Sequence, residues 1–206
     1  MGHKIDENTF FTLENCPNPE RLLWRTTGRR PVSSNVIFEL NSVQRTSPTG
    51  ISGNYVELHY PRNGVAIVPL FTGSDGLPRF VMERQFRHGT QSICLEFPAG
   101  LVEKTEAPET AARRELLEET GLIAGQLTHL GRPCLNTAYM DNYTDIFLAQ
   151  DLELAVPLTE RHLDADEQID VLSVPVSYVL THAGFGELNN GSSLLGLLFY
   201  LLKTYH

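Results

Sequence analysis

Short apolar stretches recur along the chain with the patterns of β-strands. Gly64–Leu70 is a continuous apolar run, as expected for a strand that is covered on both faces. Between Phe80 and Arg87 the side chains alternate between two faces. Further strand-like stretches are Val36–Leu40, Tyr55–Tyr60, Ser92–Phe97, Tyr143–Ala149 and Ile169–Val174. The pattern predicts a sheet that uses much of the chain.

Two segments have helical character. Residues 107–120 have a helical composition, with Pro108 in the first turn and Gly121 just past the end. Ala107 would be the N-cap, although alanine caps helices poorly. A terminal helix is expected over Leu194–Thr204. Strands before and after a central helix predict an α/β fold, with a mixed sheet and helices on its faces.

The N-terminal part of the chain differs from the rest. Prolines interrupt the first 35 residues, so we expect an irregular arm there. Turn-forming residues at 47–54 lie between two strand-like stretches and predict a β-hairpin. We therefore expect an arm and hairpin over residues 1–60 and a main domain over residues 61–206.

Composition and charge narrow the possible partners. The chain is 41% hydrophobic and 20% charged, which is typical of a globular protein and excludes a disordered one. It has 16 Lys and Arg against 25 Asp and Glu, a formal net charge of −9. Because phosphate backbones and anionic membranes attract basic surfaces, we expect a small-molecule partner and neither nucleic acid nor a membrane.

The cysteines and the apolar runs indicate a cytoplasmic location. Cys16, Cys94 and Cys134 are odd in number and widely spaced, which fits a reducing compartment. The N-terminus lacks the apolar core of a signal peptide. The longest apolar run, Leu194–Leu202, is too short to span a bilayer.

Three glutamates lie close together near the end of the predicted helix. Glu115, Glu118 and Glu119 are spaced i, i+3 and i+4, so their Cβ atoms lie about 5–6 Å apart on one face. Like charges repel at this spacing, and a helix C-terminus disfavours anions. The acids either lie in water at a solvated helix end or bind a hard divalent cation, which prefers carboxylate oxygens.

The spacing around these glutamates favours the metal site. The pattern reads Gly100, five residues, Glu106, seven residues, Arg114-Glu115-Leu116, one residue, Glu118-Glu119, one residue and Gly121-Leu122. It resembles the Nudix box at every defined position. The resemblance implies a Nudix-type α/β/α sandwich with a mixed sheet. It also implies structural roles for Gly100, Glu106, Arg114 and Gly121, with an ion pair between Arg114 and Glu106.

Residues before the box indicate a branch of this family. Arg84-Gln-Phe-Arg87 and Leu95–Gly100 resemble the ADP-ribose pyrophosphatases, and the similarity extends over about residues 35–200. The resemblance implies metal-dependent hydrolysis of the diphosphate bond of a nucleoside diphosphate sugar. The first expectation is ADP-ribose, giving AMP and ribose 5-phosphate, with Mg²⁺ as the metal and Mn²⁺ able to substitute.

The same resemblance implies metal ligands and a general base. The carbonyl of Ala99 and the carboxylates of Glu115 and Glu119 would bind the metal, and Glu118 would join them or orient water. Glu167, in an acidic loop, stands where relatives carry the general base. The alternatives are that this loop is simply solvated and that Glu118 is the base.

Substrate contacts are expected from several parts of the chain. Arg87 would contact the phosphates, and Leu101 would line the pocket or simply pack. Glu96 would lie near the substrate or be a strand residue satisfied by a neighbour. Trp24 would stack on the base or act as a packing anchor. Asn136 stands where some relatives have Asp.

Some residues depart from the ADP-ribose pattern. The proline that many of these enzymes carry downstream of the box is missing around Asn136. Another nucleotide sugar, such as GDP-mannose, therefore stays open as a substrate, as does a non-catalytic Nudix module that binds nucleotides. The hairpin region 36–60 resembles the segment with which relatives form a homodimer, so we expect a dimer.

Overall fold

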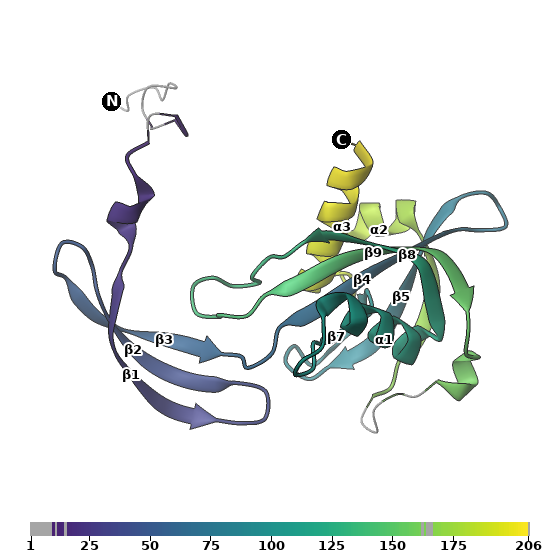
Figure 1. The fold of residues 1–206 in the computed structure, drawn as a ribbon. Helices are drawn as coiled ribbons and strands as arrows, with labels where there is room; N and C mark the ends of the chain where they lie inside the picture. Colours follow the sequence, from purple (N-terminus) through teal and green to yellow (C-terminus); the bar gives the residue numbers. More distant parts are fainter. Residues whose placement is uncertain (1–9, 11, 15, 162, 164–166, 206) are drawn as a thin grey trace. The chain divides into compact units, whose positions relative to one another are not determined.

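The computed structural model describes residues 10, 12–14, 16–161, 163 and 167–205. Figure 1 shows the course of the chain. The chain forms two compact units, which divide between His59 and Tyr60. Within the described part, no helix combines the length and the apolar character needed to cross a membrane.

The first unit is a three-stranded antiparallel sheet, preceded by the short 3₁₀-helix η2 (Pro19–Leu22). Its order is β1 (Arg25–Ser34), β2 (Glu39–Thr46) and β3 (Ser52–His59). The predicted hairpin is present as β2 and β3. Gly50 closes its turn with a φ of 87°, a left-handed conformation that suits glycine.

The predicted irregular arm was wrong for β1, which pairs with β2 along its whole length. The register shifts between Thr26 and Gly28 and again between Pro31 and Ser33. Proline is tolerated at such irregularities on an edge strand, so it did not exclude a strand here. The strand predicted over Val36–Leu40 was also misplaced, because β2 begins at Glu39.

The second unit is built around a mixed sheet of seven strands. The strands run in the order β10-β5-β4-β9-β8, while β6 pairs with β5 and β7 pairs with β4. The pairing of β4 with β9 is parallel and the others are antiparallel. The strands are β4 (Gly64–Thr72), β5 (Pro78–Arg87), β6 (Ser92–Glu96), β7 (Ala99–Leu101), β8 (Leu122–Gly131), β9 (Thr144–Leu154) and β10 (Asp170–Pro175).

Helices cover both faces of this sheet (Figure 1). Helix α1 (Pro108–Thr120) packs on the face to which Val65 and Ile67 point. Helices α2 (Val176–His182) and α3 (Gly191–Tyr205) pack with Ala66 and Val68 on the other face. Two separate apolar cores result, and the predicted α/β/α sandwich with a mixed sheet is confirmed.

Most of the predicted elements of this unit are present, some of them longer than expected. The last predicted helix begins at Gly191, and the strand predicted over Tyr143–Ala149 continues to Leu154. Strand β8, the short strand β7 and helix α2 were not predicted. Pro175 begins α2 as its N-cap, and the helix has only seven residues, which is too short for a clear helical period.

Candidate active site

Helix α1 carries the glutamates, and its two ends are held without a side-chain cap. Ala107 makes no capping hydrogen bond, and Pro108 reduces the number of free N–H groups in the first turn. Gly121 ends the helix with a φ of 71°. A Cβ atom at Gly121 would lie 2.2 Å from the carbonyl oxygen of Val156, so the chain needs glycine there.

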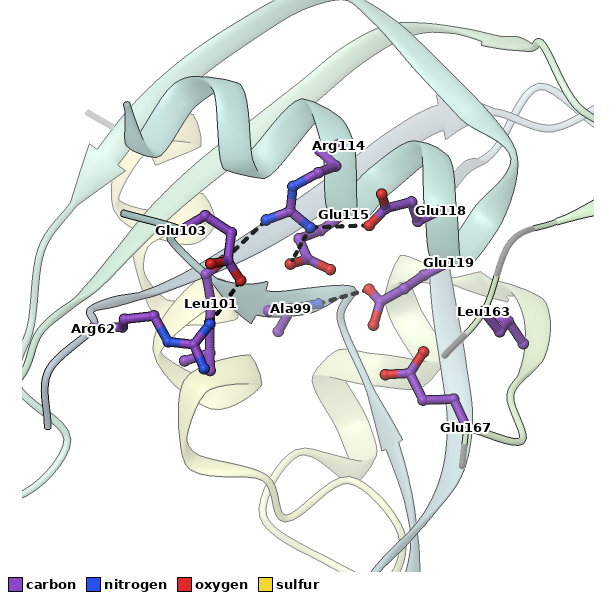
Figure 2. A pocket seen from close by; sticks show the side chains of 11 residues that line it. Arg62, Ala99, Leu101, Glu103, Arg114, Glu115, Glu118, Glu119, Leu163 and Glu167 are labelled. Carbon is purple, nitrogen blue, oxygen red and sulfur yellow. Dashed lines mark hydrogen bonds and ion pairs between the residues drawn. The ribbon is translucent and has the colours of Figure 1, made fainter. Parts of the chain in front are cut away.

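One face of α1 packs on the sheet and the other faces a cavity. Ala111, Ala112 and Leu116 are completely buried against the sheet. Glu115, Glu118 and Glu119 face the cavity, and this brings the three acids together as the helical spacing predicted. Figure 2 shows them beside strand β7.

Gly100 lets β7 pass directly under one of these acids. A Cβ atom at Gly100 would lie 2.1 Å from the carboxyl group of Glu115. Any side chain at this position therefore needs the space that the carboxyl group occupies. The glycine of the box is explained by this close approach and not by its backbone conformation.

Arg114 links three glutamates around the cavity. Its Nε and Nη2 atoms donate to the two carboxylate oxygens of Glu106, both at 3.1 Å. Its Nη1 donates to Glu115 at 2.7 Å and to Glu118 at 2.9 Å, as the dashed lines in Figure 2 show. A further bond to the carbonyl of Leu101 holds the loop before the helix. Arg114 thus braces the loop and also carries the counter-charge of two cavity acids.

Glu119 is the most deeply buried of the three acids on α1, with an exposed fraction of 3%. It accepts a hydrogen bond from the backbone N–H of Ala99 at 3.0 Å. Burial raises the pKa of its carboxyl group well above the ordinary value, and the nearby charges of Glu83 and Glu115 add to the rise. Burial also raises the pKa of Glu115. The cationic side chains around the cavity therefore do not balance the negative charge of its carboxylates.

The cavity has a volume of about 620 Å³, which suits a small molecule. Leu101, Gly100 and Ala99 form one wall, and Glu167 lies across from the helix. The full set of lining residues is Arg62, Ala99, Gly100, Leu101, Glu103, Arg114, Glu115, Glu118, Glu119, Leu163 and Glu167. Residues 164–166 of the predicted acidic loop lie outside the described residues.

A second cavity of about 640 Å³ shares the lining residue Glu167 with the first. Its other lining residues are Gln85, Phe86, Arg87, His88, Gly89 and Gln168. The predicted phosphate-binding residue Arg87 and the predicted base Glu167 therefore line the same space. A substrate with two parts could occupy both cavities with its reacting group near Glu167.

Arg87 is held in place by Glu96. Its Nε and Nη2 atoms donate to the two oxygens of Glu96 at 2.7 and 2.8 Å. Glu96 is buried and also accepts a bond from Asn190 at 2.8 Å. The structure therefore satisfies Glu96 through its neighbours, which was one of the two alternatives for this residue. A bidentate pair of this kind fixes the plane of the guanidinium.

The predicted substrate residue Asn136 is not among the lining residues of either cavity. Asn136 accepts a hydrogen bond from the N–H of Ala138 at 3.1 Å and holds its own turn. Trp24 belongs to the first unit, where it packs edge-on against Tyr55 with ring centroids 5.6 Å apart. Both roles of Trp24, stacking on the base and anchoring the packing, stay predictions.

Sequence reasoning missed Glu83 and Arg161. Glu83 lies in β5 with an exposed fraction of 0%, and burial raises the pKa of its carboxyl group. Its signal in the sequence is an acid next to the apolar residues Val81 and Met82. Arg161 donates to the main-chain carbonyls of Leu158, Glu119 and Ile169, and so ties the loop that carries Glu167 to the end of α1. No sequence pattern marks it.

The acids of the first cavity suit a hard divalent cation by their chemistry. Carboxylate oxygens of Glu115, Glu118 and Glu119 and the carbonyl of Ala99 are the kind of ligand that Mg²⁺ takes. Two of these acids are half-buried or deeper and have raised pKa values, so a cation would relieve their desolvation. Over the described ranges, no three acidic, His or Cys side chains form a complete ligand set. Arg114 forms ion pairs with Glu115 and Glu118.

Comparison with known proteins agrees with this site. The NUDIX domain model matches residues 60–181. The ADP-ribose pyrophosphatase of Bacillus subtilis (strain 168) is 28% identical over 87% of this chain and 93% of its own length. The GDP-mannose pyrophosphatase of Salmonella arizonae is 30% identical over 71% of this chain and 77% of its own length.

A solved structure shows the same fold. The crystal structure of an ADP compounds hydrolase superposes with a TM-score of 0.75 at 24% identity, covering 88% of this chain and 94% of that one. The resemblance to Nudix hydrolases that the box and its flanks indicated is confirmed. The chain therefore belongs to the Nudix hydrolase family.

Proposed function

We propose that this protein hydrolyses the diphosphate bond of a nucleoside diphosphate sugar, with ADP-ribose as the substrate and Mg²⁺ as the metal. The observation that carries the proposal is that Glu167 lines two cavities. One holds the glutamates of the box and the other holds Arg87. The similarity to an ADP-ribose pyrophosphatase supports this substrate.

Each residue has a defined part in this proposal. A divalent metal held by Ala99, Glu115, Glu118 and Glu119 supplies charge neutralisation at the diphosphate and a water of lowered pKa. Arg87, oriented by Glu96, donates to a phosphate oxygen.

Glu167, which lines both cavities, accepts the proton of the attacking water. Glu118 is the alternative base, although Arg114 already holds its carboxylate. The products are AMP and ribose 5-phosphate.

The proposal is tested by a hydrolysis panel of ADP-ribose, GDP-mannose and UDP-glucose with and without Mg²⁺. We expect AMP from ADP-ribose and a fall in kcat/KM of about a hundredfold or more in Glu119→Gln, the scale on which loss of an electrostatic contact to a transition state acts. Glu109→Gln is the matched control, since Glu109 lies on the same helix but pairs only with Arg113 among the described contacts.

The other outcomes each assign a different function. Cleavage of GDP-mannose in preference to ADP-ribose would keep the mechanism and change the substrate, and the similarity to a GDP-mannose pyrophosphatase favours this as the second candidate. No cleavage by protein that binds Mg²⁺ would contradict the proposal and favour a nucleotide-binding module. If kcat/KM fell as much in Glu109→Gln as in Glu119→Gln, the fall would not be evidence for a metal site at Glu119.

We also propose that the protein is a cytoplasmic homodimer that pairs through its first unit, with Trp24 near the nucleoside base. The support is the exposed apolar side chains of this unit, which lie in its strands and in the turns between them. They include Val32, Val36, Ile37, Ile51 and Val56. Exposed apolar surface of this kind is common at protein interfaces.

A further inference from the structure

Glu83 stands apart from the other buried acids. Among the described residues it is the one buried acid whose two carboxylate oxygens both lack a hydrogen-bond partner. Buried polar groups are almost always bonded, and a buried charge without a partner costs several kcal/mol. An unpaired carboxylate at this position therefore needs an explanation.

Its neighbour across the strands shows what a satisfied acid looks like here. Glu83 in β5 lies directly opposite Glu96 in β6, so both side chains project from the same face of the sheet. Glu96 receives two bonds from Arg87 and one from Asn190. The Nε and Nη2 atoms of Arg87 both donate to Glu96, whereas neither oxygen of Glu83 has a hydrogen-bond partner among the described residues.

The charge of Glu83 acts on the acids of the first cavity. Of the charges around Glu119, that of Glu83 has the largest effect on its pKa. The charge of Glu167 also acts on the pKa of Glu83. The cations that act on Glu83 are Arg161, which donates to main-chain carbonyls, and Arg87, which donates to Glu96. Glu83 is thus a buried acid within electrostatic reach of Glu119, and no described residue donates a hydrogen bond to it.

A packing role does not explain this residue. An apolar side chain would fill the position at lower cost, as Val81 and Met82 do beside it in the same buried strand. Carboxylate oxygens with free lone pairs, buried beside other carboxylates, are the surroundings in which a hard cation is bound. We propose that Glu83 is an additional carboxylate ligand of the divalent metal site and forms its buried floor together with Glu119.

This inference rests on the metal site of the proposed function, so the experiment must separate the two. Mn²⁺ binding to the full chain is measured by calorimetry, and the thermal unfolding midpoint is measured with and without Mn²⁺. The variants are Glu83→Gln, which keeps the shape but removes the charge, and Glu119→Gln, which tests the proposed site itself. Asp145→Asn is the control, since Asp145 is a buried acid of the same unit that accepts from His129.

We expect Glu83→Gln to weaken Mn²⁺ binding by about tenfold to a hundredfold, the range seen when groups that support a metal site are removed. The rise in unfolding midpoint on adding Mn²⁺ should shrink, while the midpoint without metal should not fall. Asp145→Asn should bind Mn²⁺ like the wild type.

Wild-type binding in Glu83→Gln together with weak binding in Glu119→Gln would overturn this inference and leave the proposed function standing. Wild-type binding in both variants would overturn both. A lower midpoint without metal and an unchanged Mn²⁺ effect would show that Glu83 is merely structural. If the amide variant fails to fold, a Mg²⁺-bound crystal decides, with a Glu83 oxygen about 2.0–2.1 Å from an ion as the expected result and an ion outside its reach as the contrary one.

Discussion

At the scale of single residues, the site depends on how closely the backbone at Gly100 approaches the carboxyl group of Glu115. The glycine is not in the left-handed region, so an alanine would fit the local backbone. The conflict is with the end of one flexible side chain, which can move. The role of Gly100 is thus to let Glu115 reach its place in the cavity.

Replacing Gly100 by alanine should therefore impair activity more than folding. The new methyl group would displace the Glu115 carboxylate, which would lower kcat/KM by about tenfold or more, while the free energy of unfolding changes by only about 1 kcal/mol. Urea denaturation and steady-state kinetics on one preparation would measure both. A loss of several kcal/mol with normal kinetics in the remaining folded protein would contradict this explanation.

The raised pKa values of Glu115 and Glu119 predict an unusual pH dependence of stability. A carboxyl group whose pKa is raised in the folded state binds its proton more tightly there than in the unfolded chain. Its favourable contribution to the free energy of unfolding is complete below the pKa of the unfolded chain, near 4.5. This contribution is lost as the pH rises toward the pKa of the folded state. Without metal, stability should thus fall as the pH rises from about 4.5 toward about 10, the value to which burial raises the pKa of Glu119.

Unfolding in urea with EDTA at several pH values measures this slope. Glu119→Gln should flatten it, because one of the titrating groups is gone, and Mg²⁺ should stabilise the wild type more at the higher pH. A slope that is the same in the wild type and in Glu119→Gln would show that other groups cause it.

Single residues also mark the limit of what the sequence predicts. The positions of Glu115, Glu118 and Glu119 follow from the helical period alone, and these side chains do meet at one cavity. Glu83 and Arg161 could not be predicted, because their surroundings come from segments far apart in the chain. For Glu83, the important fact is that Arg87 forms its ion pair with Glu96, and only the fold shows this.

At the scale of elements, local patterns predicted buried and well-bounded segments best. Strand β4 is apolar throughout because the sheet is covered on both faces, and α1 is bounded by Pro108 and Gly121. Strand β1 was missed because its pairing with β2 tolerates two register shifts and a proline. Pairing with β2 determines the structure of β1, and the β-propensities of its residues do not reveal that pairing.

Arg161 connects two elements of the site, and this gives a further prediction. Arg161 reaches the carbonyls of Leu158, Glu119 and Ile169 with three separate nitrogens. A lysine has all its donors on one nitrogen and does not match this arrangement, so Arg161→Lys should loosen the segment that leads to Glu167. We expect kcat to fall about tenfold with little change in Mn²⁺ affinity. Amide hydrogen exchange in residues 158–169 should become faster.

Arg113→Lys is the matched control, because Arg113 also donates to a main-chain carbonyl, that of Ala124, but lies outside both cavities. It should leave kcat and the exchange of residues 158–169 unchanged. An Arg161→Lys variant with normal kcat would show that Glu167 does not depend on this anchor.

At the scale of the whole molecule, the two units differ in how much apolar surface they bury. The second unit has two apolar cores, one on each face of its sheet. In the described part of the first unit, Val43 is the one hydrophobic residue that is buried. A three-stranded sheet with so small a core gains its stability from further packing.

The homodimer proposal makes this packing testable. Light scattering should give twice the 23.0 kDa of the chain. Val56→Asp, on an exposed position of β3, should shift the mass toward that of the monomer, since a charge is costly at an apolar interface. Leu77→Asp, at a similarly exposed apolar position of the second unit, should leave the mass unchanged. A monomer mass for the wild type would rule the dimer out.

Arg114 has a consequence for how the protein is made. Its guanidinium, which Glu106 also binds, offsets part of the negative charge of Glu115 and Glu118 from within the chain. We therefore expect the polypeptide to complete its fold before any metal arrives. Metal loading then becomes a late exchange of one positive charge for another, and chelation should leave behind a native apoprotein that regains activity as soon as the ion returns.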